Sequence, residues 1–399
     1  MTADQKPRKL LFHIGHHKTG TTTIQNAFAR KEVTLRDCKI LYPGNLAHNY
    51  LTRHFKAYAQ DGRLLPGRPG QPGLETIAER MQQGNFDVAV ISGEAFEDFD
   101  PEQAREVLEK FMLPHVTDHA VICYVRPHAA RILSSFAEQD KGGWLNGTPE
   151  TFFRKAETRG RFLYAPRLGK WADVFKDHFR LRPMVRAELA DGSLLQDFIA
   201  TGFGADAPVE ITSTGTANES LCLEDLVLLQ VLHGHLKAQP LAIREALGWV
   251  LAEEFGLARR GKTAGTKLKL HRSLAEAIRS AYLVDAADMD TRFFGGRTLF
   301  QAELDRAVDE ALPTAQSFDP ADHFSPDALV GISVLCTQIG RMLAQNPDQW
   351  PDVLRDLRVA AAHGTLAPLP TTNPKPRKPG PKAKKPGRKP LRKPGKAKD

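Results

Sequence analysis

KLLFHIGHHKTGTTTIQNAFA, residues 9–29, joins a short apolar run to a segment with helical periodicity. The apolar run at 10–14 predicts a buried strand. Apolar residues between 24 and 28 recur at the i, i+3, i+4 spacing of a buried helix face, and Thr21 or Thr22 is a good N-cap. The stretch therefore predicts a strand, a tight loop and a helix.

The loop of this unit has the composition of an anion site. Its backbone N–H groups and the ammonium of Lys18 precede the positive end of a helix dipole, where phosphate groups bind. In the loop of nucleotide hydrolases the lysine follows the second glycine, whereas here Lys18 comes two residues before Gly20. A Gly/Thr-rich turn that merely caps a helix is the alternative interpretation.

The order G-x-x-K-T-G-T-T in this loop resembles the 5′-phosphosulfate loop of the sulfotransferases, which use 3′-phosphoadenosine 5′-phosphosulfate as sulfuryl donor. The resemblance implies that the donor is a co-substrate and that no metal is required. The donor-binding residues that it implies in the loop are Gly15, His17, Lys18, Thr19, Gly20, Thr21 and Thr22.

A second segment carries the same resemblance. Residues 120–125 (AVICYV) predict a buried strand, Arg126 follows it, and Ser134 lies eight positions further on in a helical pattern. Arginine offers a planar fork of donors and serine a hydroxyl, so the two can converge on one anion. This resembles the 3′-phosphate motif of the sulfotransferases, although Pro127 stands where bacterial members often have a second basic residue. The alternative is an ordinary helix with a surface serine.

Weaker signals follow in an order that resembles the bacterial capsule- and glycan-type sulfotransferases. They are Tyr42-Pro43, Ile91-Ser92-Gly93-Glu94, Asp191-Gly192, Asp197-Phe198, Asn218-Glu219-Ser220 and Arg292-Phe293-Phe294. The resemblance spans roughly residues 9–300. It implies an α/β fold with a parallel sheet flanked by helices, related to nucleotide kinases, and sulfuryl transfer to a hydroxyl or amine of an acceptor, with a glycan or glycolipid favoured.

Sulfuryl transfer needs a cation at the leaving phosphate and a base for the acceptor proton. Lys18 is placed for the first task. Glu94 is our first choice for the base, because the carboxyl ends of parallel strands host ligands and Glu94 follows the predicted strand 86–91. A capping or lysine-pairing carboxylate is the alternative for Glu94. His48 is the second choice for the base, and its alternative is a surface-loop histidine.

Two other functions stay open. A kinase or NTPase of the P-loop type would use Thr19 on magnesium and Glu94 as its acidic strand end, but the glycine placement argues against it. A nucleic-acid-binding protein would act through the basic C-terminus. The cysteines show no metal spacing, and His115 and His119 alone do not supply the three or four ligands of a zinc site.

The charge of the chain is concentrated at its C-terminus. Residues 374–399 hold twelve Lys/Arg and one Asp, a charge of +11, which leaves −3 for the rest of a chain whose total is +8. Pro, Gly and cations alternate there, a composition that predicts disorder. Such a tail can bind polyanions or an anionic membrane surface through counterion release. The alternative is a solvated, weakly sticky extension.

The organisation predicted from these patterns has three parts. Residues 1–222 form the donor-binding α/β core, 223–365 a helical extension packed on it, and 366–399 a disordered Lys/Pro/Gly-rich tail. In the core, 184–186 is a candidate fourth strand and 62–73 an exposed Pro/Gly-rich loop. Helical patterns in the extension occur at 223–236, 242–256, 273–283, 300–311 and 326–345.

The compartment follows from what the sequence lacks. No apolar run approaches the ~18–20 residues of a membrane helix, and the polar N-terminus has no apolar segment of the signal-peptide type. The four cysteines, Cys38, Cys123, Cys222 and Cys336, lie far apart in the sequence and do not suggest disulfides. These features predict a cytoplasmic protein. The resemblance to the sulfotransferases implies that it acts on a glycan or small-molecule acceptor.

Overall fold

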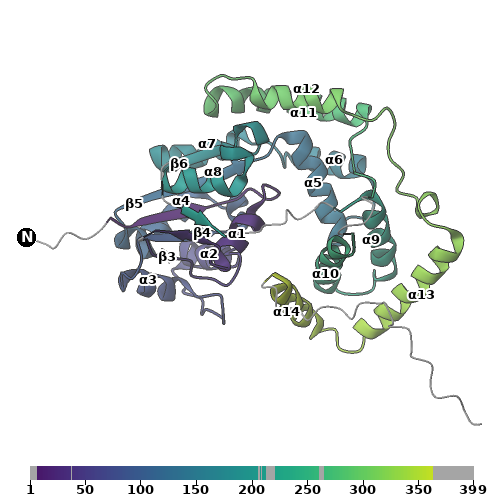
Figure 1. Cartoon of the computed structure of the whole chain (residues 1–399), viewed down its shortest axis with the longest axis horizontal. Coiled ribbons are helices and arrows are strands. Elements are labelled where there is room, and N and C mark those ends of the chain that lie inside the picture. Colours follow the sequence, from purple (N-terminus) through teal and green to yellow (C-terminus); the bar gives the residue numbers. More distant parts are fainter. Residues whose placement is uncertain are drawn as a thin grey trace, which may run out of the picture.

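An α/β part lies beside a part built from helices in the computed structural model of the chain (Figure 1). The residues that the structure describes are 7–36, 38–204, 207, 209–212, 221–259 and 265–362. The predicted linker and tail at 366–399 and the motif Asn218-Glu219-Ser220 lie outside the described residues.

Five parallel strands form the central sheet in the order β3-β4-β1-β5-β6. They are β1 (Lys9–His13), β3 (Ile40–Leu41), β4 (Val88–Ser92), β5 (Asp118–Val125) and β6 (Phe179–Pro183). The strands β1, β4 and β5 are almost continuous apolar runs because helices cover both faces of the sheet. A separate antiparallel pair joins β2 (Val33–Leu35) to β7 (Val209–Ile211). The predicted parallel α/β fold class is confirmed, and so are the strands predicted at 10–14, 86–91 and 120–125, which correspond to β1, β4 and β5.

Alternation along β1 divides the core between the two faces of the sheet. Leu10 and Phe12 face one buried cluster, and Leu11 faces the other. The helices of the α/β part whose apolar residues join Leu10 and Phe12 are α2 (Leu51–Asp61), α3 (Leu74–Gln82), α4 (Pro101–Phe111), α5 (His128–Lys141), α6 (Pro149–Thr158) and α7 (Ala165–Phe175). The helices on the face of Leu11 are α1 (Thr21–Ala29) and α8 (Leu194–Phe203).

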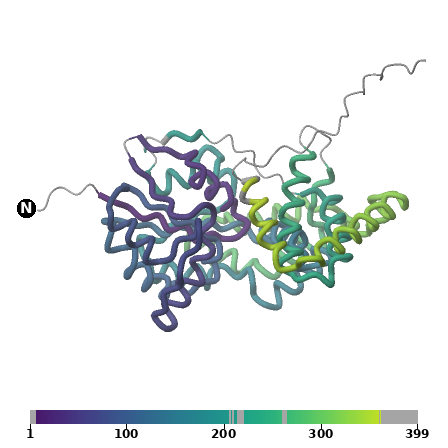
Figure 2. Tube along the Cα trace, turned by 90° about the horizontal axis from the view of Figure 1, so that it is seen from below, coloured from purple at the N-terminus to yellow at the C-terminus, as the bar shows by residue number. Residues whose placement is uncertain are grey.

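The C-terminal part confirms the predicted helical character. Its helices are α9 (Leu223–His235), α10 (Leu241–Arg259), α11 (Arg272–Phe293), α12 (Leu299–Asp309), α13 (Pro326–Leu343) and α14 (Trp350–Ala362). Helices α11 and α12 pack on α5, and α14 packs on α10, where Figure 2 shows it between the two parts. The larger buried cluster runs from β1 through α5 to Leu274 and Ile278, so one core crosses the expected boundary at residue 222.

Two local predictions need correction. Residues 184–186 are not a strand, because the edge strand β6 lies directly before them and ends at Pro183. Arg180 and Arg182 alternate with the apolar Phe179, Leu181 and Pro183, which is the period-two pattern of a half-buried strand, so the sequence prediction placed this strand too far along the chain. The N-cap of α1 is Gly20 rather than Thr21 or Thr22, because the hydroxyl of Thr21 donates to the carboxylate of Glu94 instead. The loop at 62–73 is largely exposed, as predicted.

Among the helices that the structure describes, none combines the length and the apolar character needed to cross a bilayer.

Candidate functional site

The loop between β1 and α1 lies at the carboxyl edge of the central sheet. Two glycines give it its shape. A Cβ at Gly15, whose φ is +95°, would lie 2.9 Å from Cα of Glu94, and a Cβ at Gly20, whose φ is +76°, would lie 2.5 Å from a methyl of Leu194. Both positions therefore require glycine, because another residue would be strained and would collide with its neighbours.

Consecutive backbone N–H groups of this loop lack an acceptor. Among the described residues, nothing accepts the N–H of Lys18, Thr19, Gly20 or Thr21. Lys18 and Gly20 both have φ in the left-handed region, 62° and 76°, a pattern of alternating conformation that turns successive N–H groups toward one concavity. Together with the dipole of α1, these donors form a site for an anion.

Lys18 and Arg126 bring two cations to this edge. The side chain of Lys18 is 25% exposed, and its Nζ lies 3.6 Å from Oε1 of Glu138 on α5. Arg126 follows β5 directly, and its Nη1 donates to the carbonyl of Lys18 over 3.1 Å. The strand-end position predicted for Arg126 is confirmed, and its guanidinium is in contact with the loop.

Ser134 lies on α5, about two turns after Arg126, as predicted. Its side chain is half-buried, and no described residue forms a hydrogen bond with its hydroxyl. The structure gives no direct bond between Ser134 and Arg126, so their convergence on one phosphate stays a prediction.

The hydroxyl groups of the three predicted threonines differ in whether they already form a hydrogen bond within the protein. Thr19 is fully buried, and its hydroxyl donates to the carbonyl of His16 over 2.6 Å. The hydroxyl of Thr21 donates to Glu94, whereas Thr22 is half-buried without a described partner. The hydroxyl of Thr19 therefore stabilises the loop from inside, and Thr22 is free to meet a ligand.

Glu94 opens the short 3-10 helix η1 (Glu94–Asp98) directly beyond β4, beside the loop. Its carboxylate accepts from the hydroxyl of Thr21 and from Nδ2 of Asn49 at 3.4 Å, and lies 3.7 Å from Nδ1 of His17. The side chain is 22% exposed, so solvent or a ligand reaches it. The structure therefore brings Glu94 to the loop.

His48 occupies a different environment. Its ring is fully buried, and its two ring nitrogens each lie 3.0 Å from a backbone nitrogen, of Gly44 and of Ser92. Burial lowers the pKa of His48 to about 3, so the ring is neutral at pH 7 and a weak base. It is not the surface-loop histidine of the alternative interpretation. This geometry favours Glu94 over His48 as the base, and the choice between them stays a prediction.

Sequence reasoning missed a buried carboxylate beneath the loop. Glu97 of η1 is 4% exposed and accepts the backbone N–H of His17 over 2.9 Å. Arg131 of α5 and Arg167 of α7 pair with it at 3.0 Å. These residues come from three elements far apart in the sequence, and no local pattern marks them.

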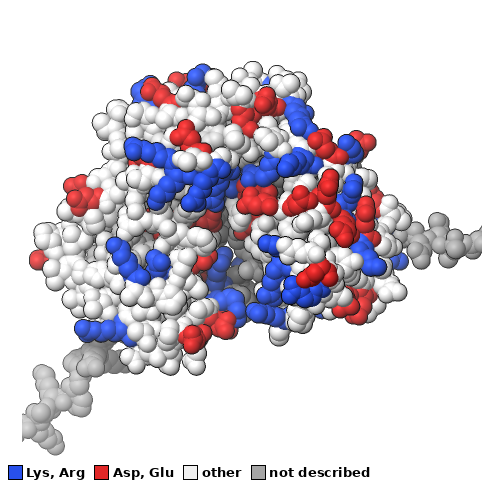
Figure 3. Space-filling view, turned by 180° about the vertical axis from the view of Figure 1, so that it is seen from behind, with Lys and Arg blue, Asp and Glu red and all other residues white. Residues whose placement is uncertain are grey.

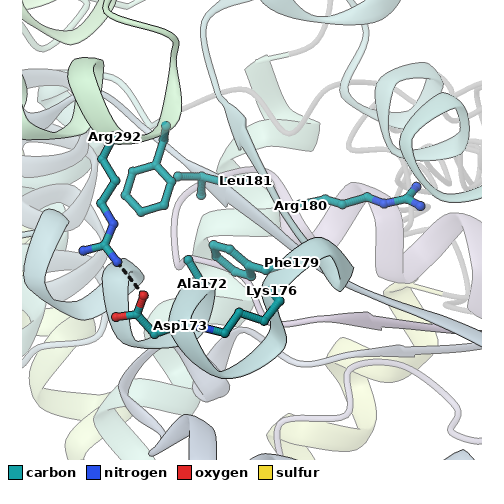
Figure 4. Close-up of a pocket in the computed structure, with 8 residues that line it drawn as sticks. Ala172, Asp173, Lys176, Phe179, Arg180, Leu181 and Arg292 are labelled. Carbon is teal, nitrogen blue, oxygen red and sulfur yellow. Dashed lines mark hydrogen bonds and ion pairs between the residues drawn. The ribbon is translucent and has the colours of Figure 1, made fainter.

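A cavity of the described part lies elsewhere. It has a volume of about 480 Å³ and lies against the edge strand β6, between the end of α7 and the end of α11 (Figure 4). Arg292, from the motif Arg292-Phe293-Phe294, lines it and pairs there with Asp173 over 2.9 Å. Arg180 points away from the cavity in Figure 4 and donates to the carbonyl of Thr201. The two arginines of this cavity are thus already engaged, whereas Lys176 lines it as an exposed lysine.

In the described part of the chain, no group of three or more His, Cys, Asp or Glu side chains is arranged to hold a metal ion.

Comparisons with known proteins give little beyond this geometry. No family model matches the chain, and no curated protein matches it. The chain is similar to a solved structure titled as a sulfotransferase from Alicyclobacillus acidocaldarius, at 14% identity over 72% of this chain and 96% of that chain. The TM-score is 0.37, too low for that likeness to establish a shared fold or function.

Proposed function

We propose that this chain is a sulfotransferase that moves a sulfuryl group from 3′-phosphoadenosine 5′-phosphosulfate to a hydroxyl or amine of an acceptor, with a glycan or glycolipid favoured. The observation that carries the proposal is the run of unpaired N–H groups at Lys18–Thr21, with the ammonium of Lys18 and the carboxylate of Glu94 beside it. An anion-binding loop and a base thus meet at one edge of the sheet.

The donor fits the groups present. The N–H groups of the loop and Lys18 would hold its 5′-phosphosulfate, because an N-terminal helix turn and an ammonium favour dianionic groups. Arg126 and Ser134 would hold its 3′-phosphate. Arg126 also forms a hydrogen bond with the carbonyl of Lys18, so the residues that would bind the two ends of the sulfuryl donor are in contact with each other.

The reaction then follows from the charges of these side chains. Glu94 would take the proton from the acceptor oxygen or nitrogen as that atom forms its bond to sulfur. The bond between sulfur and the bridging phosphate oxygen would break in line, and its electron pair would leave with adenosine 3′,5′-bisphosphate. Lys18 would neutralise the charge that develops on the bridging oxygen, an electrostatic contribution of the kind that is largest in a fixed site.

The P-loop kinase or NTPase is disfavoured by the position of Thr19. A magnesium-binding hydroxyl directly after the lysine must reach the metal, whereas Thr19 is fully buried and donates to the carbonyl of His16. Metal dependence separates the two classes. Release of adenosine 3′,5′-bisphosphate from the donor, stimulated by an oligosaccharide from an acceptor panel and unchanged by EDTA, is expected. Phosphoryl transfer from ATP that requires Mg²⁺ would contradict the proposal.

A nucleic-acid-binding role through the basic tail has less support in the described residues. On the face shown in Figure 3, Lys and Arg side chains are interspersed with Asp and Glu and do not form a single-sign surface. Residues 374–399 lie outside the described residues, and their contact with polyanions or with an anionic membrane surface remains a proposal that rests on their charge of +11.

A further inference from the structure

Glu97 lies at the centre of a buried charged cluster directly beneath the loop. Both oxygens of its carboxylate are engaged by donors. Oε2 accepts the N–H of His17 over 2.9 Å, and Nη2 of Arg131 lies 3.1 and 3.0 Å from the two oxygens. Nη2 of Arg167 donates to Oε1 over 3.0 Å. The carboxylate thus joins the loop to η1, α5 and α7.

The charges of the cluster are fixed by their surroundings. Burial opposes the charge of Glu97, but the nearby His16, Arg131 and Arg167 outweigh it and hold the pKa of this carboxyl well below its ordinary range. Burial lowers the pKa of His16 to about 3, so His16 is neutral at pH 7. Arg167 also pairs with the exposed carboxylate of Asp98 over 3.1 Å. Two guanidinium groups therefore balance two carboxylates beneath the anion site, and the cluster carries no net negative charge that would repel an anion above it.

Stability alone does not account for such a cluster. Removing charges from water costs several kcal/mol per ion, and well-packed apolar residues of similar volume are often as stable as a buried ion pair. Arg131 is 1% exposed, and its Nη1 has no partner among the described residues. The feature that an apolar pair would not reproduce is an acceptor for the N–H of His17.

The hydrogen bond to His17 fixes the peptide immediately before Lys18. Lys18 has φ 62°, a conformation that costs energy in a residue with a side chain and persists only where its surroundings hold it. With the N–H of His17 turned inward to Glu97, the next four N–H groups, at Lys18–Thr21, are left without protein acceptors. Without an acceptor at Glu97, the partly buried N–H of His17 would be left unsatisfied, and the loop would gain energy by turning it elsewhere.

We infer that Glu97 is a positioning residue that holds the loop in its anion-binding conformation, while Arg131 and Arg167 hold Glu97 and neutralise its charge. The identity of the anion as the sulfuryl donor rests on the proposed function. The hold of Glu97 on the loop does not depend on it.

Two double variants isolate the hydrogen bond from charge and volume. Both Glu97→Leu with Arg131→Met and Glu97→Gln with Arg131→Met leave the net charge of the cluster unchanged, because each removes one negative and one positive charge, and they replace the buried ion pair with side chains of similar volume. They differ in one respect, because glutamine still offers an oxygen to the N–H of His17. Asp225→Asn is the control, since Asp225 is a buried carboxylate paired with Arg259 in the helical part, at 2.6 Å.

Calorimetry with adenosine 3′,5′-bisphosphate and a melting curve are measured for each protein. We expect the leucine variant to bind at least ~10-fold more weakly than wild type, and the glutamine variant and Asp225→Asn to stay within about 3-fold. The two double variants should melt within a few degrees of each other. Equal losses in both double variants, or wild-type binding by the leucine variant, would overturn the inference.

If a variant does not fold, hydrogen exchange on the unmodified protein tests whether Glu97 holds the loop. The amide of His17 should exchange far more slowly than those of Lys18, Thr19 and Gly20, because it alone has an acceptor. Fast exchange at His17 would overturn the inference. If wild type fails to bind the bisphosphate, the proposed function fails while the exchange rates still test the hold of Glu97.

Discussion

The carboxyl edge of the sheet and the cavity at β6 are both lined by cations, yet they differ in the backbone donors that lie beside those cations. In the cavity of about 480 Å³, Arg292 is paired with Asp173, and the lining is open to solvent. At the sheet edge, the N–H groups of Lys18–Thr21 have no described acceptor. Unpaired donors held in a fixed geometry, rather than empty volume, mark the site for a charged ligand.

Substitution of Glu94 is expected to lower turnover more than any other change. Asp173, a carboxylate of the cavity, serves as its control. Glu94→Gln keeps the shape of the side chain and removes its basicity, so turnover should fall by about 10²–10⁴ while donor binding stays close to wild type. Steady-state rates and calorimetry measure the two. Asp173→Asn in the cavity should leave both unchanged. If His48→Ala is inactive and Glu94→Gln is active, the role of the base passes to His48.

Lys18 is expected to have the next largest effect. Lys18→Ala should lower turnover by on the order of 10²–10³ without unfolding the protein, because it removes the cation beside the leaving phosphate. Lys176→Ala, at an exposed lysine that lines the cavity, is the matched control. A folded Lys18→Ala protein with a near-normal rate would show that the loop does not bind the reacting group.

Arg126 and Ser134 should distinguish nucleotides by their 3′-phosphate. Arg126→Ala is expected to weaken binding of adenosine 3′,5′-bisphosphate by roughly 1.5–3 kcal/mol, the worth of a charge-assisted hydrogen bond, and Ser134→Ala by less. Adenosine 5′-phosphate should be affected little. Arg292→Ala should change neither affinity. Equal losses for both nucleotides would mean that these two residues do not contact the 3′ position.

Asp140, on α5, lies outside both the sheet edge and the cavity, and its substitution tests the pH dependence of folding stability rather than catalysis. Burial raises its pKa to about 8, and Oδ2 has no described partner, while Oδ1 accepts from Gln230 over 2.6 Å. Between pH ~4 and ~8 the unfolded chain releases this proton and the folded chain keeps it, so stability falls as the pH rises, by up to ~1.4 kcal/mol per unit.

Asp140→Asn resembles the protonated side chain and should remove that slope. Denaturant unfolding at pH 5 and pH 8 measures it. A wild-type protein as stable at pH 8 as at pH 5, relative to the variant, would contradict the assignment of a raised pKa to Asp140.

The smallest effect on turnover is expected from the tail. Deleting residues 374–399 should leave turnover on a small neutral acceptor unchanged and should reduce retention on heparin, with the loss shrinking as salt screens exposed charges beyond ~8–10 Å. Retention and rate are measured at two salt concentrations. A truncated protein that loses turnover, or that is retained on heparin as strongly as the full chain, would contradict the proposal that residues 374–399 bind polyanions and take no part in catalysis.

The sequence predicted what is local and missed what is assembled across the fold. The apolar runs of β1, β4 and β5 and the position of Arg126 follow from short-range patterns, and the structure confirms them. The edge strand β6 was missed because it is short and two of its five residues are arginines, whose side chains reach Thr201 and Asp197 in the fold. The alternation of Phe179, Leu181 and Pro183 with the two arginines is the period-two signal of a half-buried strand, but only five residues carry it.

In the candidate site too, residues marked by a local pattern were predicted, and residues brought together only by the fold were missed. Lys18 and Glu94 were predicted as neighbours because strands that pair side by side end at one edge, and β1 pairs with β4. Glu97 was missed because its role depends on Arg131 and Arg167, which reach it across 34 and 70 positions of sequence. Burial of His48 depends on the packing of Tyr42, whose ring lies 4.5 Å from it, and no pattern in the sequence shows that contact.

Titration of the full chain with adenosine 3′,5′-bisphosphate in the presence of EDTA tests the central claim most directly. The account predicts binding at a single site without any metal, at least ~10-fold tighter than adenosine 5′-phosphate, since the 3′-phosphate adds a charge-assisted contact worth about 1.5–3 kcal/mol. The Lys18→Ala variant should bind more weakly than Lys176→Ala. Absence of binding by the bisphosphate, together with Mg²⁺-dependent binding of ATP, would contradict the account.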